Sequence, residues 1–351
     1  MSAWLDLAVV KLHRFGWLRA AEYEREQTLL APVPPLTERC VFGPVLSGGE
    51  FTPGPHSIYG HNYGYPGNAT IDYYASKNMP MIRLPLLWER VQPVLNGPLD
   101  DTEMVRINAS VDYAISRKMQ VGIDIHNGGY AFGGLIGGEG GIPNSVFADL
   151  WGKLAAHYKD RGDDVLLMLM SEPGDQSATS WIGSVNAAIA AIRAAGSTQV
   201  IVVPGSYYDG AWTWTISDNS SYVGFGVKDP INRYMFEVHQ YLDYNGSGGT
   251  PDIVSPTIGA SRLVDATVWA RRYGMKFFLG EFATASDPAS LAALDNMLSF
   301  IQQNADVWKY ATWWGAGDRW MNYFLQLDPS DYANPVDRPQ MAVIQKYNVT
   351  S

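Results

Sequence analysis

Val165-Leu166-Leu167-Met168-Leu169-Met170-Ser171-Glu172-Pro173 is the stretch of sequence that decides the fold of this chain. Its first six residues are apolar, which is typical of a strand buried on both faces, as in a parallel sheet. The run ends at a small polar residue and a glutamate, and Pro173 has no backbone N–H with which to continue the strand. Glu172 is therefore predicted to lie where a buried strand ends.

A second stretch of the same design is Phe277-Phe278-Leu279-Gly280-Glu281-Phe282, and its glutamate follows Glu172 by 281 − 172 = 109 residues. It again brings a carboxylate to the end of an apolar run. Two glutamates on the ends of two buried strands are the arrangement that cleavage of a glycosidic bond by paired carboxyl groups requires. The two stretches together predict a glycoside hydrolase.

The composition narrows the class of protein. The 351 residues include 35 acidic and 25 basic side chains, a net charge of −10, which argues against a nucleic-acid partner because phosphates require a basic surface. The chain has 20 Tyr and 12 Trp, and such rings fill cores but also stack on the apolar faces of sugars. Cys40 is the single cysteine, which excludes a disulfide framework and a metal–thiolate site.

The N-terminal region reads differently from the rest. Residues 1–30 have helical spacing and residues 31–35 are rich in proline, so 1–40 are predicted to be an appendage to a catalytic domain over 41–351. No apolar run of 18 residues or more predicts a membrane span. The short apolar run after Leu5 is interrupted by Asp6 and has no basic region before it, so it is not a convincing export signal and the compartment stays open.

From Phe42 onward, predicted strands and helices alternate. Eight strands alternating with helices are the pattern of a (β/α)₈ barrel, in which the helices cover a closed parallel sheet. The strands are predicted over 43–51, 81–85, 121–126, 165–170, 200–204, 234–239, 277–281 and 310–314. The helices are predicted over 69–79, 101–118, 145–159 (capped by Asn144), 180–195, 261–273 and 290–304.

Six of the predicted strands carry polar or aromatic residues at their carboxyl ends, where such barrels gather their catalytic groups. These residues are Arg83, His126 with Asn127, Glu172, His239 with Tyr241, Glu281 and Trp314.

The motifs around these residues resemble glycoside hydrolase family five, and within it the endo-β-1,4-glucanases of fungi and bacteria. The similarity runs from about Gly48 to Tyr347. Each motif is weak by itself, but their order and spacing together are specific. The matching segments include Ile82-Arg83-Leu84-Pro85, His126-Asn127, Glu172-Pro173, His239-Gln240-Tyr241, Gly280-Glu281-Phe282, Trp313-Trp314 and Pro339-Gln340-Met341-Ala342-Val343.

The resemblance implies a retaining double displacement on a polysaccharide or oligosaccharide. Glu281 would be the nucleophile and Glu172 the general acid and base, with carboxyl groups roughly 5–5.5 Å apart. Arg83 and Tyr241 would hydrogen-bond the nucleophile and keep it ionised, and His239 would lie beside Glu172. No cofactor or metal is implied, we expect a monomer, and the family suggests a secreted or periplasmic protein.

Further residues are expected to bind the sugar chain. The resemblance assigns His126 and Asn127 to the sugar at the cleaved bond, with Trp314 stacking beneath it. Around the cleft we expect contacts from Ser171, Tyr208, Trp212, Trp320 and Arg319.

The sequence departs from the family pattern around these subsites. Ser171 stands where the family has an asparagine that binds the sugar 2-hydroxyl, and Tyr207 and Tyr208 alter the loop after the fifth strand. Gly128 replaces an aromatic residue, and Asp318 and Arg319 add two charges. We therefore expect hydrolysis with altered specificity, towards a decorated or acidic β-glucan such as a bacterial exopolysaccharide.

Other readings of the same residues remain open. Glu172, Glu281 and Arg83 could form structural ion pairs, and His126 and His239 could be core histidines or, with a glutamate, metal ligands, although no histidine-rich spacing supports a metal. The chain could be an exo-glycosidase or transglycosylase that acts on small glycosides. It could also be a carbohydrate-binding protein with weakened catalysis.

Overall fold

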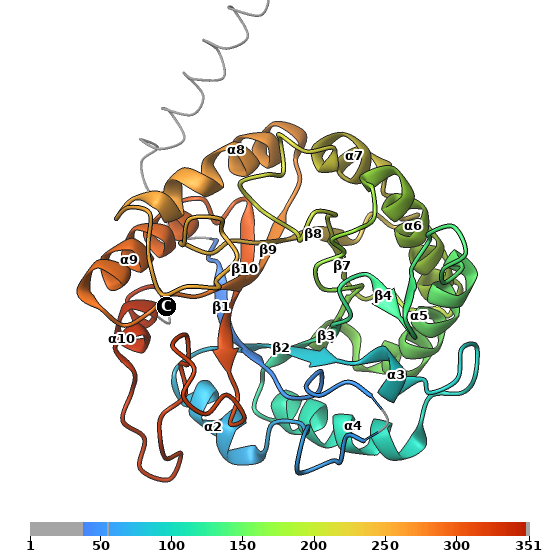
Figure 1. Ribbon diagram of the computed structural model, residues 1–351, viewed down its shortest axis with the longest axis horizontal. Coiled ribbons are helices and arrows are strands. Elements are labelled where there is room, and N and C mark those ends of the chain that lie inside the picture. The colour runs from blue at the N-terminus through green and yellow to red at the C-terminus, as the bar shows by residue number, and fades with distance from the viewer. Residues whose placement is uncertain (1–37, 55, 349–351) are drawn as a thin grey trace, which may run out of the picture.

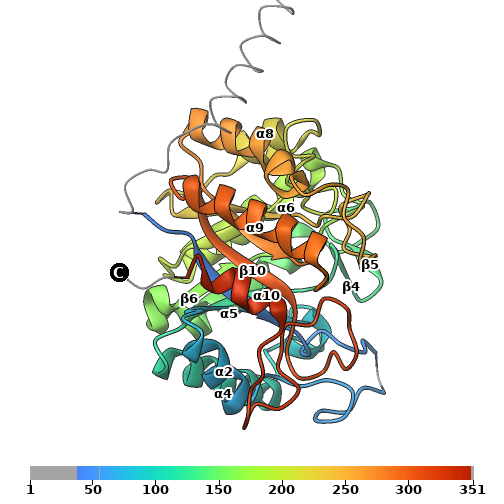
Figure 2. The ribbon, with the colours of Figure 1, turned by 90° about the vertical axis from the view of Figure 1, so that its left-hand side faces the viewer.

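The computed structural model describes residues 38–54 and 56–348, which form a closed barrel of eight parallel strands surrounded by helices (Figures 1 and 2). The predicted (β/α)₈ barrel is confirmed. The N-terminal helix and linker predicted over 1–35 lie outside the described residues. In barrel order the strands are β1 (Val41–Leu46), β2 (Met81–Leu86), β3 (Gln120–Ile125), β6 (Val165–Met168), β7 (Ile201–Pro204), β8 (Tyr234–His239), β9 (Phe277–Phe282) and β10 (Trp308–Ala316), which pairs with β1.

The helices lie outside the sheet and cover the outer faces of the strands (Figure 1). Within the described part of the chain, no helix is both long and apolar enough to cross a lipid bilayer. The helices are α2 (Asn68–Ser76), α3 (Trp88–Val91), α4 (Asp101–Ser116), α5 (Asn144–Tyr158), α6 (Ala178–Ala194), α7 (Gly224–Gly226), α8 (Ile258–Tyr273), α9 (Pro288–Gln303) and α10 (Pro339–Gln345).

One local prediction is wrong. Asn144 does not cap α5: it is the first residue of that helix, Pro143 holds the cap position, and the Asn144 side chain accepts a hydrogen bond from Ser184 of α6 at 2.7 Å. The glycine-rich segment 128–141 contains a short hairpin that the sequence did not predict, made of β4 (Tyr130–Ala131) and β5 (Gly134–Leu135). Strands of two residues are too short to produce a periodic pattern.

The inward positions of the strands change from apolar to ionisable along the barrel. Alternate residues of a strand point to the same face. On β2, Met81 belongs to a buried apolar cluster and Arg83 follows two residues later; on β8, Met235 of the same cluster is followed by Glu237 and His239. The lower part of the barrel is therefore a packed apolar core, and the charged side chains sit above it at the carboxyl ends of the strands.

An irregularity in the pairing of β8 with β9 brings the second glutamate into the barrel mouth. Val238 pairs with Leu279, but the next pair is His239 with Glu281, so Gly280 is passed over. Such a bulge re-aims the side chains of one strand. It places Glu281 opposite His239 at the same level of the barrel.

Candidate active site

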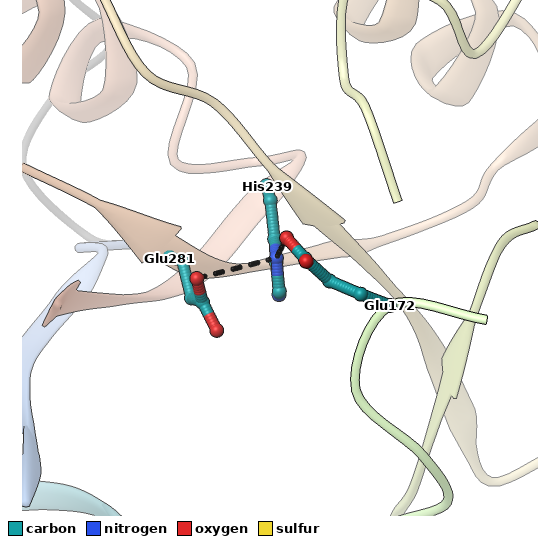
Figure 3. Close-up of side chains that lie close together, drawn as sticks. All are labelled: Glu172, His239 and Glu281. Atoms are coloured by element: carbon teal, nitrogen blue, oxygen red, sulfur yellow. Dashed lines mark hydrogen bonds and ion pairs between the residues drawn. The ribbon is translucent and has the colours of Figure 1, made fainter. Parts of the chain in front are cut away.

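Glu172, His239 and Glu281 come from three different barrel strands or the loops that follow them, and their side chains converge (Figure 3). His239 Nδ1 lies 2.8 Å from Glu172 Oε1 and 3.6 Å from Glu281 Oε2. One oxygen of each carboxylate and one ring nitrogen all lie within 4.8 Å of one another. The two glutamates thus face each other across the barrel mouth with the histidine between them.

Glu281 is the more buried of the two glutamates, and its carboxylate is surrounded by donors. Arg83 Nη1 donates to Oε1 at 2.7 Å, and the Tyr241 hydroxyl donates to Oε2 at 2.7 Å. Burial alone would raise the pKa of Glu281, but the charges of His239, Arg83 and His126 and the hydrogen bond from Tyr241 outweigh it and lower the pKa to about 2. Glu281 is therefore an ionised carboxylate at neutral pH.

Arg83 was predicted to lie at the end of a strand. It lies instead at the third position of the six-residue strand β2. Its long side chain reaches upward from there. The guanidinium is completely buried, and Nη2 forms ion pairs with Asp124 at 3.0 Å and with Glu237 at 3.1 Å. Burial opposes the charge, but Asp124, Glu237 and Glu281 raise the pKa of Arg83, so the cation persists.

His239 is the last residue of β8 and is held between carboxylates on both ring nitrogens. Nδ1 faces Glu172, and Nε2 lies 3.2 Å from Glu237 Oε1. Burial lowers the pKa of His239, but Glu281, Glu172 and Glu237 together raise it well above the ordinary value. The ring is therefore an imidazolium that donates one N–H to each neighbour.

Glu172 lies four residues beyond the end of β6. It is the more exposed of the two glutamates, since 37% of its side chain is accessible to solvent against 5% for Glu281. Its backbone adopts the left-handed conformation, with φ of 49°. The backbone N–H donates to Asp209 Oδ2 at 3.0 Å. This unusual backbone turns the side chain of Glu172 towards His239.

Three of the residues expected to bind the sugar chain form an aromatic group on the β10 side of the mouth. The rings of His126 and Trp314 are stacked, with centroids 5.3 Å apart and planes 10° apart, and His126 Nδ1 hydrogen-bonds Asp124 Oδ2 at 3.0 Å. Trp320 meets Trp314 edge to face at 5.3 Å. These contacts give a rigid apolar wall near the two glutamates.

Three other predicted binding residues have different surroundings. Both ends of the Asn127 amide are already engaged, with Glu89 Oε2 at 2.8 Å and the Trp88 N–H at 2.9 Å. Ser171 is buried, and its hydroxyl has no hydrogen-bond partner within the described residues. Arg319 packs along Gly48 and Gly64.

The two aromatic residues predicted in the loop after β7 are open to solvent. The side chain of Tyr208 is 60% exposed and that of Trp212 is 38% exposed. Arg262 lies over the Trp212 ring at 4.9 Å and fixes its orientation. Their role in binding stays a prediction.

Two buried carboxylic acids at this site were not predicted from the sequence. Glu237 pairs with both Arg83 and His239, and it could have been recognised because it precedes His239 by two residues on the same face of one strand. Asp209 carried no such signal, since it lies in an irregular loop. A third buried carboxylate, Asp124, contacts Arg83 and His126.

Three of these side chains could also be considered as metal ligands. Glu172, His239 and Glu281 present three donor atoms close together, which is a geometry that a cation could use. However, both ring nitrogens of His239 donate to carboxylates, and the Arg83 cation already occupies one side of Glu281. The site is therefore better suited to acid–base and nucleophilic chemistry than to a bound ion.

Known proteins are similar to this chain in sequence and in fold. Residues 45–317 match the family model described as cellulase (glycosyl hydrolase family 5). Endo-β-1,4-glucanase B of Aspergillus niger is 35% identical over 292 residues, which cover 83% of this chain and 85% of that protein. Endoglucanase 3 of Humicola insolens is 32% identical over 291 residues, covering 82% and 73% of the two chains.

Solved structures agree with these sequence matches. The endo-β-1,4-glucanase Xac0029 of Xanthomonas axonopodis pv. citri superposes with a TM-score of 0.83 at 36% identity, over 88% of this chain and 98% of the other. The structure of XacCel5A in complex with cellopentaose gives a TM-score of 0.84 at 40% identity, with the same coverage.

Proposed function

This chain belongs to glycosyl hydrolase family 5, and from that premise we propose that it cleaves internal bonds of a β-1,4-glucan by a retaining double displacement. That it is a glycoside hydrolase of the endo-β-1,4-glucanase kind follows from the family. The proposal adds the stereochemical course, the roles of the two glutamates and the position at which specificity is altered.

The separation of the two carboxyl groups carries the retaining assignment. An oxygen of Glu172 and an oxygen of Glu281 lie within 4.8 Å of each other. Retaining enzymes hold their carboxyl groups about 5–5.5 Å apart, whereas inverting enzymes leave about 6.5–9.5 Å for a water molecule between the base and the sugar. The gap in this site has the size for direct attack.

The environments of the two glutamates assign their roles. Glu281 is held ionised by Arg83 and Tyr241, as a nucleophile must be, and attacks the anomeric carbon. Glu172, which is open to the cleft, protonates the departing glycosidic oxygen. In the second step Glu172 takes a proton from water, the water oxygen bonds to the anomeric carbon, and the bond to Glu281 breaks.

His239 supports this exchange by its position between the two carboxylates. Its Nδ1–H donates to Glu172 when that carboxylate is ionised, and its positive charge acts on both glutamates. Glu237, beneath the ring, accepts the Nε2–H and fixes the orientation of the imidazolium. The histidine is therefore a positioning and charge-balancing group for the proton transfers at Glu172.

Action on a polymer is supported by the relatives and by the surface around the site. XacCel5A was crystallised with cellopentaose, a chain of β-linked glucose units, and the curated relatives are endoglucanases. In this chain, the exposed aromatic side chains of Tyr208 and Trp212 lie in the loop after β7, and the Trp314–Trp320 group lies at the end of β10 and in the loop that follows it. Aromatic rings in both places suit several consecutive sugar units.

Altered specificity is centred on Ser171. Its side chain is shorter than the asparagine expected there, and its buried hydroxyl has no partner within the described residues. We expect the space beside the sugar 2-hydroxyl to admit a substituent or a branch. Arg319, which motivates the acidic form of this substrate hypothesis, donates to the His61 carbonyl at 3.5 Å and packs against the segment around Gly64.

The test combines product stereochemistry with two variants. Nuclear magnetic resonance of the first product from a β-1,4-linked cello-oligosaccharide should show the β-anomer, and viscosity of a soluble cellulose should fall faster than reducing ends appear. Glu281→Gln and Glu172→Gln should each lower kcat by several orders of magnitude while sugar binding persists. A first product of α configuration, or full activity in Glu281→Gln, would overturn the proposal.

A further inference from the structure

The loop after β7 carries a buried carboxylic acid that touches both members of the Glu172–His239 pair. Asp209 is completely buried. Its Oδ2 accepts the backbone N–H of Glu172 at 3.0 Å, and its backbone carbonyl accepts the N–H of His239 at 2.7 Å. Ala211 N–H then donates back to the carbonyl of His239 at 2.9 Å. A single residue therefore connects the loop to β8 and to the segment that carries Glu172.

Backbone strain is concentrated at the same place. Tyr207, Tyr208 and Asp209 are three consecutive left-handed residues, with φ of 57°, 58° and 55°, and Glu172 is also left-handed. Such a backbone conformation is unfavourable for residues other than glycine and persists only where the surroundings hold it. The hydrogen bond between Asp209 and Glu172 joins two strained segments, so each one holds the other in place.

We propose that Asp209 is a positioning residue for the general acid and base: it fixes the backbone of Glu172 so that its carboxyl group meets His239 and faces Glu281. The inference rests on the proposed function, because it assigns the proton transfers to Glu172. It concerns only those transfers. The nucleophile Glu281 is held by other residues, Arg83 and Tyr241.

The protonation state of Asp209 determines which variant should preserve the function. Burial raises the pKa of Asp209 well above its ordinary range. The nearby His239 lowers this pKa, whereas Glu237 and Glu172 raise it further. A neutral carboxyl group still accepts the Glu172 N–H through its carbonyl oxygen. Asparagine has the same shape and the same acceptor, so Asp209→Asn should retain the contact, whereas Asp209→Ala removes it.

The experiment compares aryl β-cellobiosides whose leaving groups differ in their need for a proton. Phenol departs slowly without an acid, whereas dinitrophenolate needs no proton. For Asp209→Ala we expect kcat/KM on the phenyl substrate to fall by roughly 10- to 100-fold, part of the total that acid catalysis supplies. The value on the dinitrophenyl substrate should fall far less. Azide, which needs no general base, should restore turnover of the dinitrophenyl substrate and form a β-glycosyl azide.

Two variants complete the design. Asp209→Asn should keep the wild-type leaving-group dependence and the wild-type pH profile. Asp243→Ala is the matched control, because Asp243 is also buried and accepts backbone N–H groups, from Gly248 and Gly249, without touching Glu172. Its loss of activity should be the same for both leaving groups and should not respond to azide.

Each result either supports or overturns the positioning role of Asp209. A loss in Asp209→Ala that is equal for both leaving groups, or a loss in Asp209→Asn as large as that in Asp209→Ala, overturns the positioning role. If Asp209→Ala does not fold, Asp209→Ser, whose hydroxyl is withdrawn from the Glu172 N–H, is measured in the same way with the same criteria. A wild-type enzyme that cleaves neither cellobioside nor any β-1,4-glucan would instead contradict the proposed function itself.

Discussion

Tyr241 donates a hydrogen bond to the carboxylate of Glu281, and this contact leads to a prediction about pH. A hydrogen bond to a charged group contributes about 1.5–3 kcal/mol, which corresponds to about one to two pH units. Without it, the pKa of Glu281 rises from its value of about 2. Because Glu281 must be ionised to attack, the acidic limb of the kcat/KM profile of Tyr241→Phe should move to higher pH.

The measurement is the pH dependence of kcat/KM on a cello-oligosaccharide for wild type and Tyr241→Phe. Tyr310→Phe serves as the control, because the Tyr310 hydroxyl donates to Gln120 Oε1 at 2.9 Å and its ring packs against the apolar cluster in the lower part of the barrel. An acidic limb that stays in place, or moves to lower pH, would show that Tyr241 does not stabilise the ionised nucleophile.

Ser171 gives the second prediction at this scale. Asparagine at this position can reach the sugar 2-hydroxyl, a contact that strengthens in the transition state. Ser171→Asn should therefore raise kcat/KM on unsubstituted cellulose chains and lower it on glucans that are branched or substituted at that hydroxyl. Reducing-sugar release from both kinds of polymer gives the ratio, and an unchanged ratio would remove Ser171 from the account of specificity.

The sequence predicted the site residues that belong to motifs. It did not predict positions that depend on the length of a side chain or on irregular backbone. Glu172 and Glu281 were recognised because each ends an apolar run. Arg83 was assigned to the site but at the wrong level of the barrel, since the length of its side chain is not visible in strand spacing. Asp209 depends on three left-handed residues in succession, which no periodic pattern indicates.

At the scale of the elements, the eight barrel strands were predicted within a few residues, because fully buried strands produce continuous apolar runs. The first strand was the exception. It was expected over 43–51 and lies at Val41–Leu46, because the chain turns away at Gly48, where φ is 142°. The short elements β4, β5 and α7 were missed, since two or three residues carry no periodicity.

The bulge in β9 makes a prediction about an element. A Cβ at Gly280 would overlap Glu237 Oε1, and that carboxylate cannot move freely because Arg83 and His239 both hold it. Gly280→Ala should therefore lower the free energy of unfolding by about 1–3 kcal/mol, the usual effect of overpacking. Activity should fall as well, because Glu237 orients His239.

The control for this change is Gly122→Ala on β3. A Cβ there meets the Met168 sulfur and the Met81 terminal methyl group, which belong to flexible apolar side chains that no ion pair holds. Urea denaturation of both variants gives the comparison. Equal destabilisation of the two would mean that the charged group beneath His239 is not held as tightly as its contacts suggest.

At the scale of the whole molecule, the catalytic function is expected to reside in the barrel alone. The side chains that contact Glu172 and Glu281 lie between Arg83 and Glu281, and the family match covers residues 45–317. Removal of residues 1–37 should therefore leave kcat/KM on a soluble β-glucan unchanged. Removal of residues 1–46, which deletes β1, should abolish folding because β1 closes the barrel. A loss of turnover in the shorter deletion would assign the N-terminal region a part in catalysis.

Closure of the barrel through β1 and β10 also has a consequence for biosynthesis. Val41 pairs with Tyr310, which leaves the ribosome 310 − 41 = 269 residues later. At roughly 5–20 residues per second, that delay is on the order of tens of seconds. Throughout this interval the backbone groups along one side of β1 lack their native neighbour. That edge is where the nascent chain is most exposed to pairing with a strand from another polypeptide.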